Sequence, residues 1–218
     1  MKKELKICLP IYKILYSAAF VLILSFVRGI TFVDEIGIAL ESPIALLTVI
    51  FCADTYLVEL HNKRRDVFRL FPVKKQTTAI LRRLLIQMIY LVFIAIAGYG
   101  MFYWQKPGEV MGGITSGTAF GQFLAAIPGT VLFWGIFSMT ICNVVRNMWA
   151  GIGITMCIWL TLVSQAGSDF LGKWNVFSYM FRETDQWKDL SWMYGKSLSV
   201  ILAVLLILLI PVVLKKRG

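Results

Sequence analysis

Six stretches of this chain are each apolar and long enough to cross a lipid bilayer, which takes about 20 mostly apolar residues. None of them alternates steadily between apolar and polar residues, and backbone polar groups in lipid must pair within their own segment, so helices are expected rather than barrel strands. Apolar residues make up 58% of the chain and charged residues only 16%, which excludes an ordinary soluble enzyme and a disordered tail. The predicted fold is an all-α polytopic membrane protein, one domain over residues 1–218, with six transmembrane helices at Ile11–Val27, Pro43–Leu60, Leu84–Trp104, Phe120–Cys142, Trp149–Gln165 and Ser197–Leu214.

The distribution of basic residues predicts the orientation of these spans. Sixteen Lys and Arg residues and three acids fall on the side that holds both termini, whereas the other side has six basic residues and eight acids. Because Lys and Arg favour cytoplasmic loops, both termini are expected in the cytoplasm and the protein in the cytoplasmic membrane. The net charge of +10 is thus explained by topology, so the expected partner is the bilayer and not nucleic acid.

A basic segment between the second and third spans is larger than a simple connection needs. Residues 62–71 fit a short amphipathic helix that Pro72 ends, with apolar side chains at helical spacing. The segment is either a juxtamembrane patch that contacts anionic lipid, or a helix that docks on a cytoplasmic partner. Its candidate docking residues are Lys63, Arg64, Arg65, Asp66, Phe68, Arg69, Leu70, Phe71 and Pro72.

Two acids lie near the cytoplasmic end of the predicted second span. Asp54 is expected about a turn and a half inside it, and an intramembrane carboxylate is a candidate for gating or ion coupling. The alternative is a helix-end carboxylate that pairs with a nearby Lys or Arg. Glu59 is the weaker candidate, because Lys63 follows it at the i+4 position.

The predicted fourth span carries a stripe of small residues, and such a stripe lets two helices approach closely. It serves either a dimer interface or a moving helix along a pathway, or else close packing within the chain. Pro128 and Gly129 also predict a kink. The residues of this small-residue stripe recur every four positions and are Gly113, Gly117, Gly121, Ala125 and Gly129. The candidate helix-packing or pathway residues are Gly117, Gly121, Ala125, Pro128 and Gly129.

The residue sets of common catalytic and metal sites are missing. His61 is the only histidine, and the four cysteines form no C-x-x-C pair, so no metal site is predicted. Residues 167–174 come close to a phosphate-binding loop, but Trp174 stands where that loop needs a hydroxyl. We therefore expect no catalytic residues, no cofactor and no nucleotide site in this chain.

The region between the second and third spans has an acid near the end of the second span (Asp54), Glu59 five residues later, the basic amphipathic stretch, and Phe71-Pro72 before Lys74-Lys75. This region resembles that of the permeases of export-type (type-2) ABC transporters. In that family a coupling helix between helices two and three docks on the ATPase. The family also has six helices, cytoplasmic termini and a large outer segment between helices five and six that re-enters the membrane. The aromatic-rich segment Ala166–Lys196 matches that segment in place and size.

The resemblance implies a non-catalytic permease subunit that moves an amphipathic or hydrophobic substrate, such as a peptide, lipid or drug, out of the cell. ATP and magnesium would bind a separate ATPase partner, and a second permease subunit, identical or related, would complete the pathway. Compact members of this kind are common in Gram-positive bacteria and often handle antimicrobial peptides. Three alternatives stay open: a secondary transporter that uses Asp54, a substrate-binding subunit of an energy-coupling vitamin importer, and, last, a membrane enzyme.

Overall fold

A computed structural model describes residues 2–57, 70–105, 107–108, 115–182 and 189–217. Over these ranges the chain is helical and contains no strand, only an isolated bridge between Phe32 and Gly108. Within the described ranges, the structure has six long helices and three short elements. The short elements are α1 (Lys2–Cys8), α9 (Gln165–Leu171) and the 3-10 helix η1 (Gly172–Trp174). The long helices are α2 (Ile11–Val27), α3 (Glu35–Cys52), α6 (Val73–Trp104), α7 (Ser116–Val145), α8 (Met148–Val163) and α10 (Trp192–Arg217).

Each of the six predicted spans overlaps one of these long helices. Four of the helices are long and apolar enough to cross a membrane, namely α3, α6, α7 and α10. A fifth candidate is α8 taken together with α9 and η1, which bend by 71° relative to it. The remaining helix, α2, is apolar but only 17 residues long. The described residues therefore give an all-helical chain with four to five candidate spans, and the sixth span stays a prediction.

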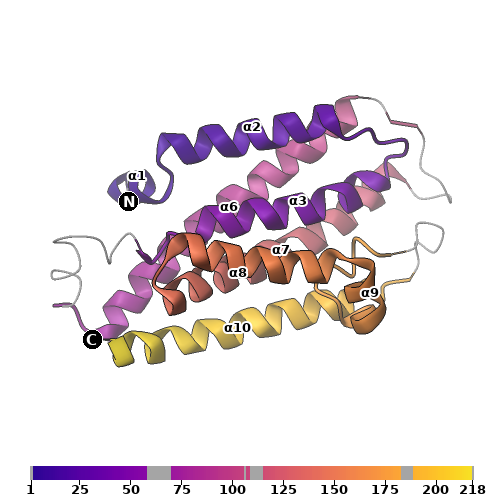
Figure 1. The fold of residues 1–218 in the computed structure, drawn as a ribbon. Helices are drawn as coiled ribbons and strands as arrows, with labels where there is room; N and C mark the ends of the chain where they lie inside the picture. The colour runs from indigo at the N-terminus through magenta and orange to yellow at the C-terminus, as the bar shows by residue number, and fades with distance from the viewer. Residues whose placement is uncertain (1, 58–69, 106, 109–114, 183–188, 218) are drawn as a thin grey trace.

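The long helices lie side by side in an elongated bundle (Figure 1). At one end are α1, the start of α6 and the last turns of α10, and we refer to this as the α1 end. The bend into α9 lies at the opposite end, here called the α9 end. The core is built around α7, which packs against α3, α6, α8 and α10. Fully buried side chains from three helices fill it, including Leu40, Ile44, Leu91 and Ile127.

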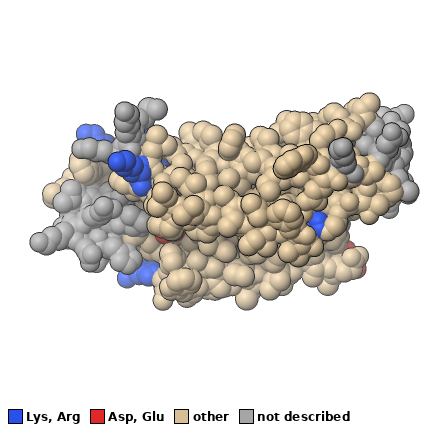
Figure 2. All heavy atoms as spheres, turned by 90° about the horizontal axis from the view of Figure 1, so that it is seen from above, with Lys and Arg blue, Asp and Glu red and all other residues tan. Residues whose placement is uncertain are grey.

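The outer surface of the bundle is strongly apolar. Figure 2 shows charged side chains toward the two ends of one face and a broad uncharged band between them. Large exposed apolar side chains occur along three helices: Leu22, Ile23 and Phe26 of α2, Leu85, Ile89 and Phe93 of α6, and Leu205 and Leu208 of α10. A contiguous apolar surface of this kind is compatible with a membrane-embedded protein.

The second predicted span is wrong in its boundaries. The helix begins at Glu35 and ends at Cys52, and Pro43, the predicted start, lies in its interior. Proline removes one helical hydrogen bond and frees the carbonyl four residues earlier, here that of Ala39. The guanidinium of Arg28 donates to that carbonyl oxygen at 2.9 Å. A partner outside the helix thus replaces the missing bond, which lets α3 continue through the proline.

Local sequence sets the tight turn between α7 and α8. Arg146 ends α7 with a positive φ of 61°, and the Asn147 side chain accepts from the backbone N–H groups of Trp149 and Ala150. A Cβ at Gly151 would lie 2.5 Å from the sulfur of Cys142. Only glycine lets the two helices come this close, so they pack as an antiparallel pair.

Candidate functional site

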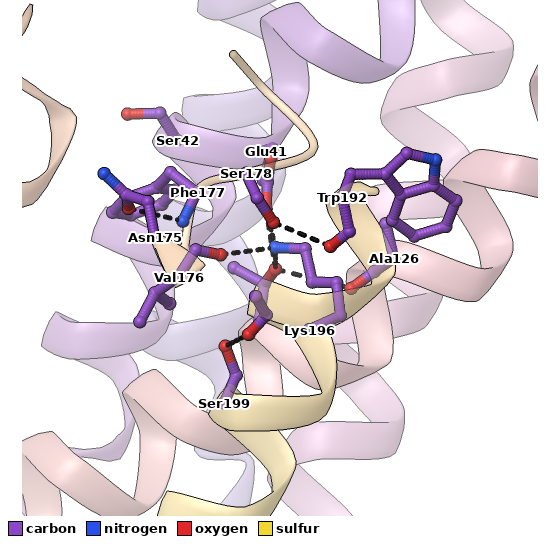
Figure 3. A network of polar contacts seen from close by, with 12 residues as sticks. Glu41, Ser42, Ala126, Asn175, Val176, Phe177, Ser178, Trp192, Lys196 and Ser199 are labelled. Carbon is purple, nitrogen blue, oxygen red and sulfur yellow. Dashed lines mark hydrogen bonds and ion pairs between the residues drawn. The ribbon is translucent and has the colours of Figure 1, made fainter. Parts of the chain in front are cut away.

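A buried ion pair joins two helices near the α9 end of the bundle. Glu41 of α3 is fully buried, and Lys196 of α10 is 6% exposed. The Lys196 ammonium donates to Oε1 of Glu41 (Figure 3). Sequence analysis placed both residues in outer loops, and the structure corrects this by placing each inside a long helix.

The Lys196 ammonium brings four segments of the chain together. Besides Glu41, it donates to the hydroxyl of Thr130 on α7 and to the backbone oxygen of Val176, each at 2.7 Å. The Thr130 hydroxyl also lies 3.0 Å from Oε1 of Glu41. An ammonium has three donors, and here all three have an acceptor. The charge is therefore satisfied even though it is removed from solvent.

The carboxylate of Glu41 is less completely paired than the ammonium. Its second oxygen, Oε2, is buried and has no hydrogen-bond partner among the described residues. Desolvating two charges is costly, and such a pair holds only while both partners stay in place. Any movement of α3 relative to α10 that separates Glu41 from Lys196 would therefore cost considerable free energy.

The turn at residues 175–178 is fixed on α10 beside this pair. Ser178 donates to the backbone oxygen of Trp192 at 2.7 Å, and the Asn175 side chain accepts from the N–H of Phe177 at 2.8 Å (Figure 3). A Cβ at Gly195 would lie only 2.0 Å from the backbone oxygen of Asn175. The missing side chain lets the turn approach the helix closely enough for Val176 to accept from Lys196.

A second ion pair lies toward the α1 end and involves the predicted residue Asp54. Its carboxylate accepts from the Lys13 ammonium of α2 at 2.5 Å, and its side chain is 20% exposed. Lys13 also donates to the backbone oxygen of Phe51 at 2.7 Å. Asp54 lies two residues after Cys52, the last residue of α3, and its place within a membrane span stays a prediction. In the structure, Asp54 is a carboxylate near a helix end that is paired with lysine.

Some of the remaining predicted site residues lie in the part of the chain that the structure describes, and others lie outside it. Leu70, Phe71 and Pro72 are exposed and directly precede α6. Gly117, Gly121, Ala125 and Pro128 of α7 are also exposed, whereas Gly129 is buried near Val200. Gly113 of the stripe lies outside the described residues, and the role of the stripe, as a dimer interface, a moving helix along a pathway or close packing within the chain, stays a prediction. The other predicted residues, Glu59, Lys63, Arg64, Arg65, Asp66, Phe68 and Arg69, lie outside the described residues.

The spacing of apolar residues around Glu41 and Lys196 indicates that both side chains lie on buried helix faces. Leu40 and Ile44 continue the apolar face of α3 across Pro43, and Glu41 lies between them. On α10, Trp192, Lys196 and Ser199 recur at i, i+4 and i+7, the spacing of one helix face. Within the described ranges, no group of three or more His, Cys, Asp or Glu side chains could hold a metal ion.

Comparison with known proteins found no relative of this chain. No protein-family model matches the chain, and no curated protein or solved structure matches it either. The fold defines the protein as a bundle of apolar helices compatible with a membrane. A more particular function has to be argued from its own residues.

Proposed function

We propose that the chain is the permease subunit of an ATP-driven exporter, which moves an amphipathic or hydrophobic substrate across the cytoplasmic membrane. A separate ABC ATPase, which binds ATP and magnesium, would supply the energy. Both chain termini would face the cytoplasm, so the α1 end of the bundle would be the cytoplasmic end. The peptide, lipid or drug character of the substrate follows from the apolar helices and their few buried charges.

The observation that carries this proposal is the length and position of α6. This helix has 32 residues, hence a length of about 48 Å at 1.5 Å per residue, whereas the hydrocarbon core of a bilayer is about 30 Å thick. It begins directly after the exposed Leu70, Phe71 and Pro72. Its first fully buried side chain is Ile80, beyond which it packs against α2, α3 and α7. One rigid element thus connects the predicted docking segment with the core.

This arrangement suggests how ATP hydrolysis could act on the bundle. Closure of two ATPase subunits would push on residues 62–72, and α6 would carry the displacement into the core. At the same end, the Lys13–Asp54 ion pair links α2 with the end of α3. At the other end, the Glu41–Lys196 pair links α3 with α10. These two ion pairs join α3 to α2 and α10 and do not include α6, so alternating access would require α6 to move relative to those helices.

We place the second permease subunit, identical or related, along the exposed small-residue stripe of α7. A Cβ at Gly121 would meet no heavy atom within 4 Å in this chain, so the helix face is open to a partner. We expect Gly121→Ile to reduce the fraction of chain that carries a second subunit by about tenfold, since overpacking a close helix contact costs about 1–3 kcal/mol. The fraction is measured after gentle detergent extraction.

Gly100→Ile provides the matched control for this prediction. Gly100 lies on α6, is exposed, and also has no heavy atom within 4 Å of an added Cβ. It lies outside the stripe, so this variant should leave the subunit pairing unchanged. Equal effects of the two substitutions would exclude the stripe as the subunit interface.

The experiment that tests the proposed function is purification of the tagged chain from its native membrane, followed by identification of the proteins that accompany it. We expect an ABC ATPase in a fixed ratio to the chain. A stable, folded preparation without any ATPase would refute the permease assignment. Transport driven by an ion gradient in such a preparation would instead establish a secondary transporter.

A further inference from the structure

A cavity of about 350 Å³ lies at the α9 end of the bundle, beside the turn at residues 175–178. Its walls come from η1, from the turn after it and from the start of α10. Besides Ser168 of α9, the residues with polar groups that line it are Lys173, Ser178, Arg182, Asp189, Ser191 and Trp192. Its volume lies in the range of small-molecule sites, about 300–1,000 Å³.

Two residues that line this cavity each carry a buried hydrogen-bond donor that is unused among the described residues. Neither Nε1 of Trp192 nor Nε of Arg182 has a hydrogen-bond partner among the described residues. Trp192 is 4% exposed, and Figure 3 shows its ring turned away from the Lys196 ammonium, with the nitrogen on the far edge. An indole N–H and a guanidinium both donate hydrogen bonds and accept none. Both groups therefore require an acceptor, and buried donors without one are rare.

The charged side chains that line the cavity, within the described part of the chain, favour an anion. Lys173 and Arg182 contribute two positive charges, and Asp189 contributes one negative charge. The Asp189 carboxylate is already occupied, because it accepts from the backbone N–H and the hydroxyl of Ser191, each at 2.8 Å. These hydrogen bonds lower the pKa of Asp189, so it stays ionised at neutral pH. The net charge of the three groups is positive.

Arg182 is held in place at the edge of the cavity. Its guanidinium lies over the ring of Tyr179, 4.4 Å from the ring centre, and one terminal nitrogen donates to the Gln122 side chain. The contacts fix the guanidinium and leave its Nε for another partner. Donors on Lys173, Arg182 and Trp192 come from three separate parts of the chain, which suits a group with several acceptor oxygens, as a phosphate has.

Exposed aromatic side chains lie within two residues, along the chain, of residues that line the cavity. Phe170, Trp174 and Tyr194 are exposed, and the rings of Trp174 and Tyr194 lie 5.7 Å apart. Amphipathic aromatic rings settle at the boundary between lipid and water. A ligand bound here would thus have polar donors in the cavity and exposed aromatic side chains nearby in the chain.

We infer that this cavity binds the phosphate-bearing headgroup of an amphipathic molecule, with Lys173, Arg182 and the Trp192 N–H as donors. The inference concerns binding by this chain alone and does not rest on an ATPase partner. The ligand is a membrane lipid or a transported amphiphile with the same headgroup chemistry.

The test is equilibrium binding of radiolabelled dioctanoyl phosphatidylglycerol to the detergent-purified full chain. Two unlabelled competitors separate the parts of the ligand: dioctanoylglycerol has the same acyl chains without phosphate, and inorganic phosphate has no acyl chains. We expect saturable binding that neither competitor displaces well. Equal displacement by dioctanoylglycerol would overturn the phosphate assignment, and equal displacement by inorganic phosphate would overturn the amphipathic one.

Variants then locate the site. Lys173→Gln changes an exposed side chain, and Trp192→Phe removes the N–H but keeps a ring against Tyr179, so both should fold. Each should weaken binding by about tenfold, as expected for loss of a hydrogen bond to a charged group. Lys74→Gln, an exposed cation at the start of α6, should change nothing. If Lys74→Gln weakened binding as much as Lys173→Gln, lipid would be binding through general charge, and the site would be refuted.

Discussion

Replacing Lys196 by methionine is expected to lower the free energy of unfolding by about 3–5 kcal/mol, the typical cost of breaking a buried ion pair from one side. Methionine has a similar length but no charge, so Glu41 would stay fully buried with only the Thr130 hydroxyl as a donor. The Val176 carbonyl would lose its contact as well. Unfolding in mixed detergent micelles, followed by tryptophan fluorescence, measures the change.

A double variant and a control separate the ion pair from general packing. Glu41→Gln combined with Lys196→Met removes both charges, so it should recover much of the stability lost in the single variant. Lys13→Met breaks the other ion pair, but water can still reach Asp54, whose side chain is 20% exposed. We expect a smaller loss there, about 1–2 kcal/mol. A double variant no more stable than Lys196→Met alone would contradict this account of the pair.

The double variant Leu70→Ser with Phe71→Ser is expected to reduce the amount of ATPase bound to the chain by at least about tenfold. Burying each of these side chains in a partner contributes about 1.5–3 kcal/mol, and Leu70 is 83% exposed in this chain alone. The helix α6 starts after them and should form unchanged, because neither side chain is buried in the core. The ratio of ATPase to permease after purification is the measurement.

The opposite end of the same helix offers the control for this variant. Tyr103 and Trp104 are also exposed apolar residues of α6. Replacing both by serine should leave ATPase binding intact, because they lie at the end that would face away from the ATPase. Loss of binding in both double variants would indicate a general effect on α6 and would argue against docking at Leu70 and Phe71.

Hydropathy was enough to predict the helical class and the order of the long helices. The apolar stretches are long, and in α2 the predicted and observed bounds are the same, Ile11–Val27. The error in the second span arose at Pro43, which was predicted as the start of the helix but lies in its interior. Its tolerance inside α3 depends on Arg28, a residue of another segment, and no local pattern reveals that contact.

The buried Glu41–Lys196 pair was harder to predict, because it too depends on a contact between distant segments of the chain. Glu41 and Lys196 are 155 residues apart, and each alone looks like a charged residue of a loop. Only the tertiary pairing makes their burial tolerable, since a lone charge in that position would be very costly. Asp54 was identified from its sequence position, but its partner Lys13 was not, because pairing across helices depends on how α2 lies against α3.

The most direct test of the central claim is a photo-crosslinking amino acid at position 71, activated in the native membrane. If the chain is a permease that docks its ATPase through the segment before α6, the main crosslinked product contains an ABC ATPase subunit. The same probe at position 104, at the other end of α6, should give no such product. Crosslinks from position 71 to lipid or to this chain alone, with no ATPase, would contradict the account.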